Sequence, residues 1–155
     1  MGFVLDLPAA TRAAEEIHAD GKRIAFTNGC FDVFHAGHVR ILRIAREAAD
    51  VLFVGLNDDE GVRRLKGPGR PANRLEDRAE VLRAIRYVDH VVAFAEDTPI
   101  RLIKGIRPDA LVKGADYLET EIVGAKEIKE WGGELIRVPL LEGRSSTRII
   151  AGDVA

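Results

Sequence analysis

The feature of this sequence that most constrains its fold is a regular alternation of short apolar runs with amphipathic stretches. The run at residues 51–58 is almost unbroken, as expected for a strand buried on both faces of a sheet. Strands joined by crossover helices form a parallel sheet, so the pattern predicts an α/β fold: a doubly wound parallel sheet of five strands with helices on both faces. The predicted strands are residues 23–29, 51–58, 90–94, 110–114 and 134–140.

Caps, glycines and prolines mark the ends of the predicted helices. Asp6 can cap a helix that Gly21 ends, and Thr98-Pro99 looks like a cap followed by proline at the first helical position. Residues 63–74 interrupt the alternation with two glycines and two prolines, so we expect a loop there. The predicted helices are residues 8–19, 37–50, 75–86, 98–105, 122–131 and 145–154.

Length and composition limit the classes of protein to which the chain can belong. Its 155 residues can bury one core, so we expect a single domain over residues 1–155. A formal net charge of −2 gives no reason to expect a nucleic-acid partner, since duplex binders carry an excess of Lys and Arg. A single cysteine excludes an internal disulfide and indicates a cytoplasmic protein. No apolar run reaches about 20 residues, so we expect neither a signal peptide nor a membrane span.

The stretch TNGCFDVFHAGHV, residues 27–39, follows the first long strand and begins a helix. Doubly wound sheets bind ligands outside the carboxyl ends of their strands, and free backbone N–H groups at a helix start favour an anion. Gly29 and Gly37 allow the backbone to approach a ligand closely, and His35 and His38 can donate from Nε2 without a fixed charge. The stretch predicts a phosphate site.

Two other interpretations of this stretch are open. Both histidines could be ordinary polar residues at a helix start, although two of them around one glycine at this place in the fold favour a site. Cys30, His35 and His38 could hold zinc, but a structural zinc site needs a fourth ligand and no second arm is visible. The glycine motifs of dinucleotide-binding enzymes and P-loop kinases are absent from the expected context.

The stretch NGCFDVFHAGH resembles the nucleotide-binding HxGH signature of the cytidylyltransferase-like nucleotidyltransferases. The resemblance continues in order through RLKGPGRPANRLEDR, EDTPIRLIKGIRPDALVKGADY and GRSSTRII, covers nearly the whole chain from about residue 22, and is strongest to the heptose 1-phosphate adenylyltransferases. It implies a Rossmann-like fold and transfer of the adenylyl group of ATP onto a heptose 1-phosphate, giving an ADP-sugar and pyrophosphate by in-line displacement. Departures are Cys30, Ser146 and Ala115, whose Cβ restricts the backbone where the family usually has glycine.

The resemblance also implies roles for individual residues. Catalysis falls to His35, His38 and Lys66. The residues implied to bind the nucleotide are Asn28, Gly29, Phe31, Gly37, Gly114, Asp116, Tyr117, Ser145, Ser146 and Thr147. The residues implied to bind the sugar phosphate are Asp32, Arg70, Asn73 and Arg78.

Structural alternatives stay open for several of these residues. Asp32 fits either a substrate-orienting role or that of a buried structural carboxylate. Arg78 either faces the phosphates or forms an ion pair on the surface, and Tyr117 either contacts the nucleotide or packs in a loop. Plain N-capping explains one of the three hydroxyl residues that begin the last helix.

The loop at 63–74 carries five basic residues and no acid in a chain of negative net charge. Two like-charged substrates must be neutralised there, so we interpret the loop as a local anion site, although a solvated basic loop remains an alternative. The basic residues are Arg63, Arg64, Lys66, Arg70 and Arg74.

The resemblance implies Mg²⁺ held mainly by phosphate oxygens and water, with no protein metal ligands. We also expect a homodimer and a separate heptose 7-phosphate kinase, because the kinase half of the bifunctional relatives is absent from this sequence. Three rival functions remain: transfer from CTP or ATP to another acceptor such as glycerol phosphate or FMN, a nucleotide-sensing binding module, and a zinc-binding interaction domain. The intact histidines and Lys66 argue against the sensor.

Overall fold

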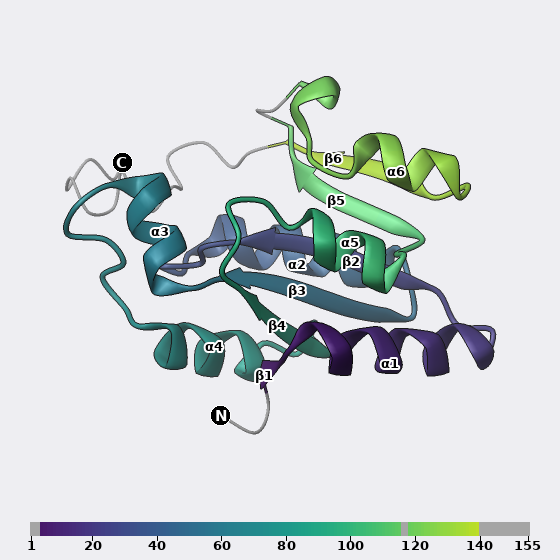
Figure 1. The fold of residues 1–155 in the computed structure, drawn as a ribbon, viewed down its shortest axis with the longest axis horizontal. Helices are drawn as coiled ribbons and strands as arrows, with labels where there is room; N and C mark the ends of the chain where they lie inside the picture. The colour runs from purple at the N-terminus through teal and green to yellow at the C-terminus, as the bar shows by residue number, and fades with distance from the viewer. Residues whose placement is uncertain (1–3, 116–117, 140–155) are drawn as a thin grey trace.

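The computed structural model describes residues 4–115 and 118–139. They form one parallel sheet of six strands in the order β1-β4-β3-β2-β5-β6 (Figure 1). The strands are β1 (Val4–Leu5), β2 (Ile24–Gly29), β3 (Val51–Asn57), β4 (His90–Phe94), β5 (Ala110–Gly114) and β6 (Glu134–Val138).

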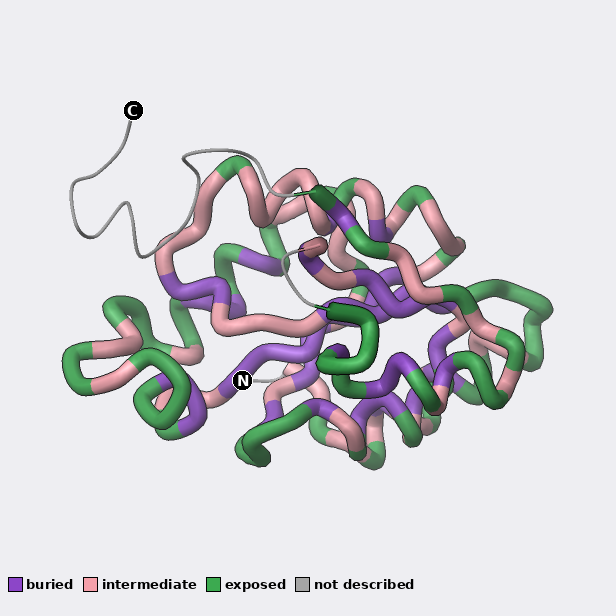
Figure 2. Tube along the Cα trace, turned by 90° about the horizontal axis from the view of Figure 1, so that it is seen from above, coloured by how far each residue is buried: buried purple, intermediate pink, exposed green. Residues whose placement is uncertain are grey.

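Helices cover both faces of the sheet because successive strand residues point to opposite sides. Ile24 and Phe26 pack with α1, α5 and α6 on one face, whereas Ala25 packs with α2 and α4 on the other. The buried residues of the strands run through the middle of the molecule (Figure 2). The helices are α1 (Leu7–Ala19), α2 (Ala36–Glu47), α3 (Asp59–Lys66), α4 (Leu75–Ala84), α5 (Ile100–Ile106) and α6 (Ala125–Glu130), with a 3₁₀ turn η1 (Glu119–Glu121).

The doubly wound parallel sheet predicted from the sequence is confirmed, but it has six strands rather than five. The additional strand, β1, is two residues long and pairs with β4 through Val4 and Val91. A strand this short carries no alternation that a sequence pattern could reveal. The core strands β4 and β5 have the predicted bounds, 90–94 and 110–114.

Part of the predicted loop at 63–74 is helical, because α3 continues to Lys66. Asp58 caps this helix by accepting a hydrogen bond from the backbone N–H of Gly61 at 2.8 Å. Acidic residues fill its first turn and basic residues its last turn, as the helix dipole favours. Gly67, with φ of 97°, then ends the helix in a conformation that other residues rarely adopt.

Two further helix boundaries differ from the sequence-based expectation. Pro99, rather than Thr98, occupies the cap position of α5. The helix predicted over 122–131 is shorter, because Gly124 adopts φ of 92° before α6 begins at Ala125. The helix predicted from residue 145 lies outside the described residues. None of the helices described is long and apolar enough to cross a membrane.

The crevice of the sheet lies between β2 and β5, where the strand order reverses. Strand β2 pairs with β3 along its whole length, from Ile24 to Gly29. Its pairing with β5 includes only Ala25 and Phe26. The carboxyl ends of β2 and β5 therefore leave room for a ligand at the place where doubly wound sheets bind one.

Candidate functional site

A pocket of about 390 Å³ opens at the carboxyl ends of β2, β3 and β5, beneath the first turns of α2 and the last turn of α3. Seven of the residues that the sequence analysis assigns to the site line this pocket: Asn28, Gly29, Phe31, Asp32, His38, Lys66 and Gly114. The lining residues are Thr27, Asn28, Gly29, Cys30, Phe31, Asp32, His38, Ile41, Asn57, Leu65, Lys66, Asp97, Lys113 and Gly114.

The two histidines of the HxGH stretch close the amino end of α2 around Gly37. His35 is the N-cap residue, and its Nδ1 accepts a hydrogen bond from the backbone N–H of Gly37 at 3.1 Å. Nδ1 of His38 accepts from the backbone N–H of His35 at 3.2 Å, and the two rings stack with centroids 3.8 Å apart. Both rings therefore satisfy helix-end donors, as a capping box does.

These backbone hydrogen bonds fix the tautomer of both rings. Because each Nδ1 accepts a hydrogen bond, a neutral ring carries its proton on Nε2. Burial, with smaller effects from His35 and Lys66, lowers the pKa of His38 to about 3. Burial also lowers the pKa of His35. At neutral pH the pair thus consists of uncharged Nε2–H donors, and the His38 side of the pair lines the pocket.

The lowered pKa values predict how stability depends on pH. Unfolded histidine titrates near 6.5, whereas His38 in the folded protein stays neutral down to about 3. Below pH 6.5 the unfolded chain binds more protons, so the free energy of unfolding falls as pH drops towards 3. Between about pH 7.5 and about pH 5.5, the titration of this histidine is expected to lower the free energy of unfolding by about 1 kcal/mol. Urea unfolding of the wild type and of His38→Gln, which cannot titrate, measures the difference; equal losses would contradict it.

Phe31 forms a wall of the pocket from an uncommon backbone conformation. Its φ is 49°, in the left-handed region, and its ring centroid lies 5.1 Å from that of His38. A Cβ at position 29 would lie 3.1 Å from Cε2 of Phe31. Gly29 is therefore needed for this ring position, which holds an apolar surface beside the histidine.

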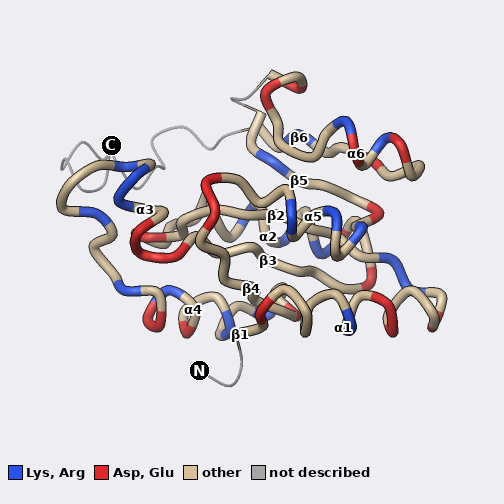
Figure 3. The backbone as a smooth tube through the Cα atoms, viewed as in Figure 1, with Lys and Arg blue, Asp and Glu red and all other residues tan. Residues whose placement is uncertain are grey.

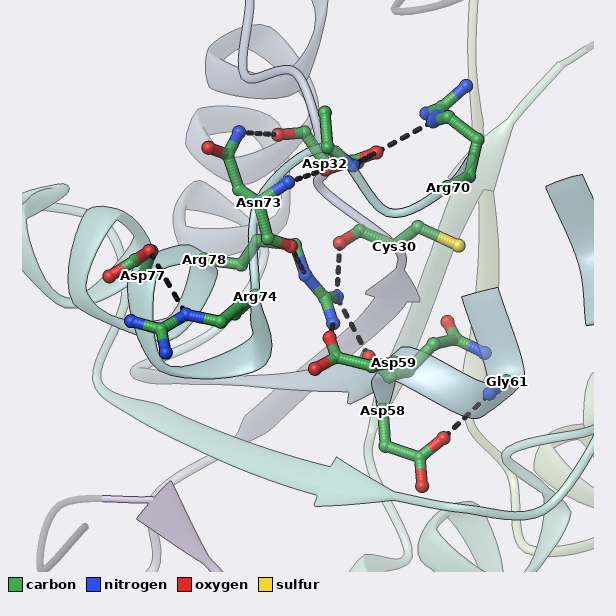
Figure 4. A network of polar contacts seen from close by, with 12 residues as sticks. Cys30, Asp32, Asp58, Asp59, Gly61, Arg70, Asn73, Arg74, Asp77 and Arg78 are labelled. Carbon is green, nitrogen blue, oxygen red and sulfur yellow. Dashed lines mark hydrogen bonds and ion pairs between the residues drawn. The ribbon is translucent and has the colours of Figure 1, made fainter. Parts of the chain in front are cut away.

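Asp32 organises the segment that follows α3 (Figure 4). Its buried carboxylate accepts hydrogen bonds from Arg70 Nε at 2.7 Å, Ala72 N at 2.7 Å and Asn73 N at 2.8 Å. Burial raises the pKa of Asp32, but these three donors outweigh it and hold the pKa below its ordinary value. With its oxygens engaged in this way, Asp32 has the contacts of a structural carboxylate: it lines the pocket and holds Arg70 and Asn73 behind it, and neither of these two is a lining residue.

Arg78 does not lie where the sequence suggested. Its side chain is 0% exposed, so neither the phosphate-facing position nor the surface ion pair is correct. The guanidinium donates to the backbone carbonyls of Asn73, Cys30 and Asn57 at 2.8–2.9 Å. It also donates to Asp59 Oδ1 at 2.7 Å, so it joins three chain segments, around residues 30, 57–59 and 73 (Figure 4). Arg78 supports the site from behind and has no surface left for a ligand.

Most of the basic residues around α3 and the following loop (Figure 3) are already paired. Lys66 forms no ion pair within the part of the chain that the structure describes, and it lines the pocket near His38. Nη2 of Arg70 is buried without a hydrogen-bond partner, while its Nε is held by Asp32. The four ion pairs are Arg63–Glu60, Arg64–Asp97, Arg70–Asp32 and Arg74–Asp77.

The structure adds lining residues that the sequence interpretation did not include among the site residues. Asn57 ends the apolar run of β3, and a polar residue in that place was a usable signal. Lys113 Nζ donates to the carbonyl of Asn28 at 3.3 Å, which links β5 to β2 beside the predicted Gly114. The other additions are Thr27, Cys30, Ile41, Leu65 and Asp97.

Five of the predicted nucleotide-binding residues lie outside the described residues: Asp116, Tyr117, Ser145, Ser146 and Thr147. Among residues 4–115 and 118–139, no group of three or more His, Cys, Asp or Glu side chains is arranged to hold a metal ion. The two carboxylates that line the pocket already have partners. Asp32 accepts hydrogen bonds from the loop, and Asp97 forms an ion pair with Arg64.

The chain is similar to proteins of known sequence. Residues 26–152 match the family described as cytidylyltransferase-like. The chain is 53% identical over 153 residues to the bifunctional protein HldE of Gluconacetobacter diazotrophicus, and 51% identical over 147 residues to that of Pseudomonas paraeruginosa. The alignments cover 97% and 95% of this chain but 32% and 31% of the relatives. The chain thus spans about a third of the length of the curated relatives it matches.

Two solved structures share the fold. A lipopolysaccharide core biosynthesis protein from Thermoplasma volcanium has a TM-score of 0.62 and 21% identity, over 78% of this chain and 98% of that one. Pantoate-beta-alanine ligase from Francisella tularensis, complexed with beta-gamma ATP and beta-alanine, has a TM-score of 0.65 and 14% identity, over 97% of this chain and 76% of that one. At these identities the likeness concerns the fold alone, and it confirms the predicted Rossmann-like sheet.

Proposed function

The chain belongs to the cytidylyltransferase-like family, and we propose that it joins a heptose 1-phosphate to the α-phosphate of ATP, giving an ADP-sugar and pyrophosphate. The observation that carries the proposal is the pair of neutral Nε2–H donors at the start of α2, beside a lysine without an ion pair in the described residues. Identities of 48–53% to bifunctional HldE proteins support the choice of substrates.

The arrangement suits a direct displacement. An oxygen of the sugar phosphate attacks the α-phosphorus of ATP, the bond from that phosphorus to the bridging oxygen breaks, and pyrophosphate leaves with the electron pair. No covalent nucleophile is needed, so catalysis rests on positioning and on stabilising negative charge. The amino end of α2 and Nε2–H of His38 face the triphosphate, and Lys66 supplies a positive charge near the transferred group.

The segment that Asp32 holds by hydrogen bonds is the best candidate to bind the acceptor phosphate. The Asp32 carboxylate holds the Nε edge of Arg70, which leaves the buried Nη2 without a partner. A phosphate oxygen there would satisfy this donor in a charge-assisted hydrogen bond. Asn73 is fixed beside it by its own hydrogen bond from Nδ2 to the Asp32 carbonyl at 2.7 Å.

Mg²⁺ fits this site as an ion that arrives with the nucleotide. The pocket carboxylates Asp32 and Asp97 form ion pairs with arginines. The main ligands of the ion would therefore be phosphate oxygens of the nucleotide and water. When bound, the ion would neutralise charge on the triphosphate. Lys66 and the histidine donors would hold the remaining oxygens.

Nucleotide choice provides the direct test. ATP is expected to support turnover at least about tenfold better than CTP, a difference of about 1.4 kcal/mol in transition-state binding. Pyrophosphate release is measured with purified protein across ATP and CTP, each with heptose 1-phosphate, glycerol phosphate and FMN. Preference for CTP with glycerol phosphate would replace the heptose assignment, and nucleotide binding without any pyrophosphate release would favour the sensing module.

Two finer expectations belong to the same proposal. A heptose 7-phosphate kinase would act before this reaction, and hydrolysis of the 7-phosphate from its bisphosphate product would leave the heptose 1-phosphate acceptor. We also expect a homodimer in solution, which sedimentation equilibrium measures directly.

A further inference from the structure

Asn57 carries a carboxamide that lines the pocket and that no described side chain or backbone group engages. It ends β3, is 3% exposed and lines the pocket. Its backbone carbonyl accepts a hydrogen bond from Arg78 Nη1 at 2.8 Å. Its carboxamide makes no hydrogen bond within residues 4–115 and 118–139.

The carboxamide atoms are not among the buried polar atoms that lack a partner in the described residues, so they open into the pocket and can meet water there. A ligand that displaces this water has to replace its hydrogen bonds. An amide that faces a pocket and no protein group is therefore placed to bond a ligand.

The position of Asn57 indicates which substrate it meets. The guanidinium of Arg78 joins the carbonyl of Asn57 to that of Asn73, so Asn57 lies beside the segment that carries Arg70. In the sheet, β3 is separated from β5 by β2, so Gly114 bounds the opposite side of the pocket. Asn57 thus lies on the side that the proposed function gives to the acceptor.

We propose that the carboxamide of Asn57 binds a hydroxyl group of the acceptor sugar and so selects a polyol phosphate over a bare phosphate. An amide both donates and accepts, which matches a hydroxyl group. A phosphate only accepts, and Lys66 and Arg70 already serve it as cations. This inference rests on the proposed function for the identity of the acceptor.

The Asn57→Leu variant tests the assignment, because leucine has nearly the same shape and no hydrogen-bonding group. We expect KM for the sugar 1-phosphate to rise about tenfold or more, with KM for ATP within about twofold. Thermal stability should be nearly unchanged, because the carboxamide makes no hydrogen bond to the described residues, whereas a structural amide would lower it on removal. Asn28→Leu, at the end of the neighbouring strand, is the matched control and is expected to raise KM for ATP instead.

A set of acceptors that each lack one hydroxyl sharpens the comparison. The wild type should lose affinity for one member of the set, and Asn57→Leu should bind that member and the full sugar phosphate alike. An unchanged acceptor KM, a rise in KM for ATP alone, or a clear loss of stability would each overturn the assignment.

Failure of the proposed function would look different. If the wild type uses another phosphate acceptor, the heptose assignment fails and the Asn57 comparison is made with that acceptor. If nothing is turned over, calorimetric titration of heptose 1-phosphate beside a non-hydrolysable ATP analogue compares the two proteins. Equal affinities, or binding by neither protein, would overturn the Asn57 assignment.

Discussion

Replacement of His38 by alanine is expected to lower kcat by about a hundredfold or more, the scale of losing one donor to a developing oxyanion. The neutral ring of His38 lines the pocket, where the proposed reaction would build up charge on the α-phosphate. Single-turnover rates per folded molecule measure the loss. The variant should also lose stability, because Nδ1 of His38 accepts a hydrogen bond at the start of α2. Removing that hydrogen bond should cost about 1 kcal/mol.

Two amide variants separate these roles of His38. In His38→Asn the amide oxygen can lie near the place of Nδ1, so it can still accept from the backbone N–H of His35, but no donor reaches the phosphate. We expect nearly normal stability and the full loss of kcat. In His38→Gln the amide nitrogen lies near the place of Nε2, so part of the rate should return while the hydrogen bond to the helix end is lost. Near-normal turnover by a well-folded His38→Ala or His38→Asn protein would rule out this account.

His35 should respond to the same substitutions with a larger share in binding. It is the N-cap residue of α2, and asparagine is a good N-cap, so His35→Asn should keep the helix intact. Any loss of activity then reports the missing Nε2–H. We expect a larger effect on KM than for His38 if His35 binds the phosphates remote from the reaction. Those phosphates are held before transfer as well as during it, so the lost contact weakens substrate binding.

The sheet could be predicted well because each central strand is marked by the residues within it and directly beside it. Residues 90–94 and 110–114 are short apolar runs bounded by polar residues, and the structure returns the same bounds. The position of HxGH was equally readable, since a strand, a glycine and a helix start follow one another in a few residues. The local pattern did not predict α3. Gly67 and Pro68 indicate a loop, although Asp58 caps a helix that reaches Lys66.

The candidate site was less predictable where its residues act through distant partners. Asp32 was open between substrate contact and structure, and the sequence could not show that Arg70, Ala72 and Asn73 converge on it. The basic loop likewise carried no acid in its own sequence. Its partners, such as Asp97, come from other segments, and they leave Lys66 as the cation without an ion pair among the described residues.

Arg78 shows the same limit most clearly, and it supports the second large prediction. Its guanidinium bonds to three backbone carbonyls and to Asp59, and these groups come from segments between positions 30 and 73. Nothing in the sequence around position 78 reveals that convergence. The side chain is fully buried, so removing it leaves three acceptors without donors and a cavity behind them.

Arg78→Ala is therefore expected to lower the free energy of unfolding by about 3–5 kcal/mol, as when one partner of a buried ionic network is removed. Arg78→Lys should recover only part of this, because an ammonium group cannot reach four acceptors in the planar arrangement of a guanidinium. Arg74→Ala is the matched control one turn earlier. Arg74 is exposed and lies 3.9 Å from Asp77, so we expect a change within about 0.5 kcal/mol.

Urea unfolding followed by circular dichroism measures these differences, and substrate kinetics on the folded fraction add a second readout. A phosphate-binding arginine would raise KM for the sugar phosphate and leave stability intact. A network arginine should lower stability first and raise KM for both substrates together, because it holds both Cys30, which lines the pocket, and Asn73, which the proposed function assigns to the acceptor. If Arg78→Ala unfolds like the Arg74→Ala control and changes only the acceptor KM, the arginine contacts the ligand directly and the structural role assigned to it is wrong.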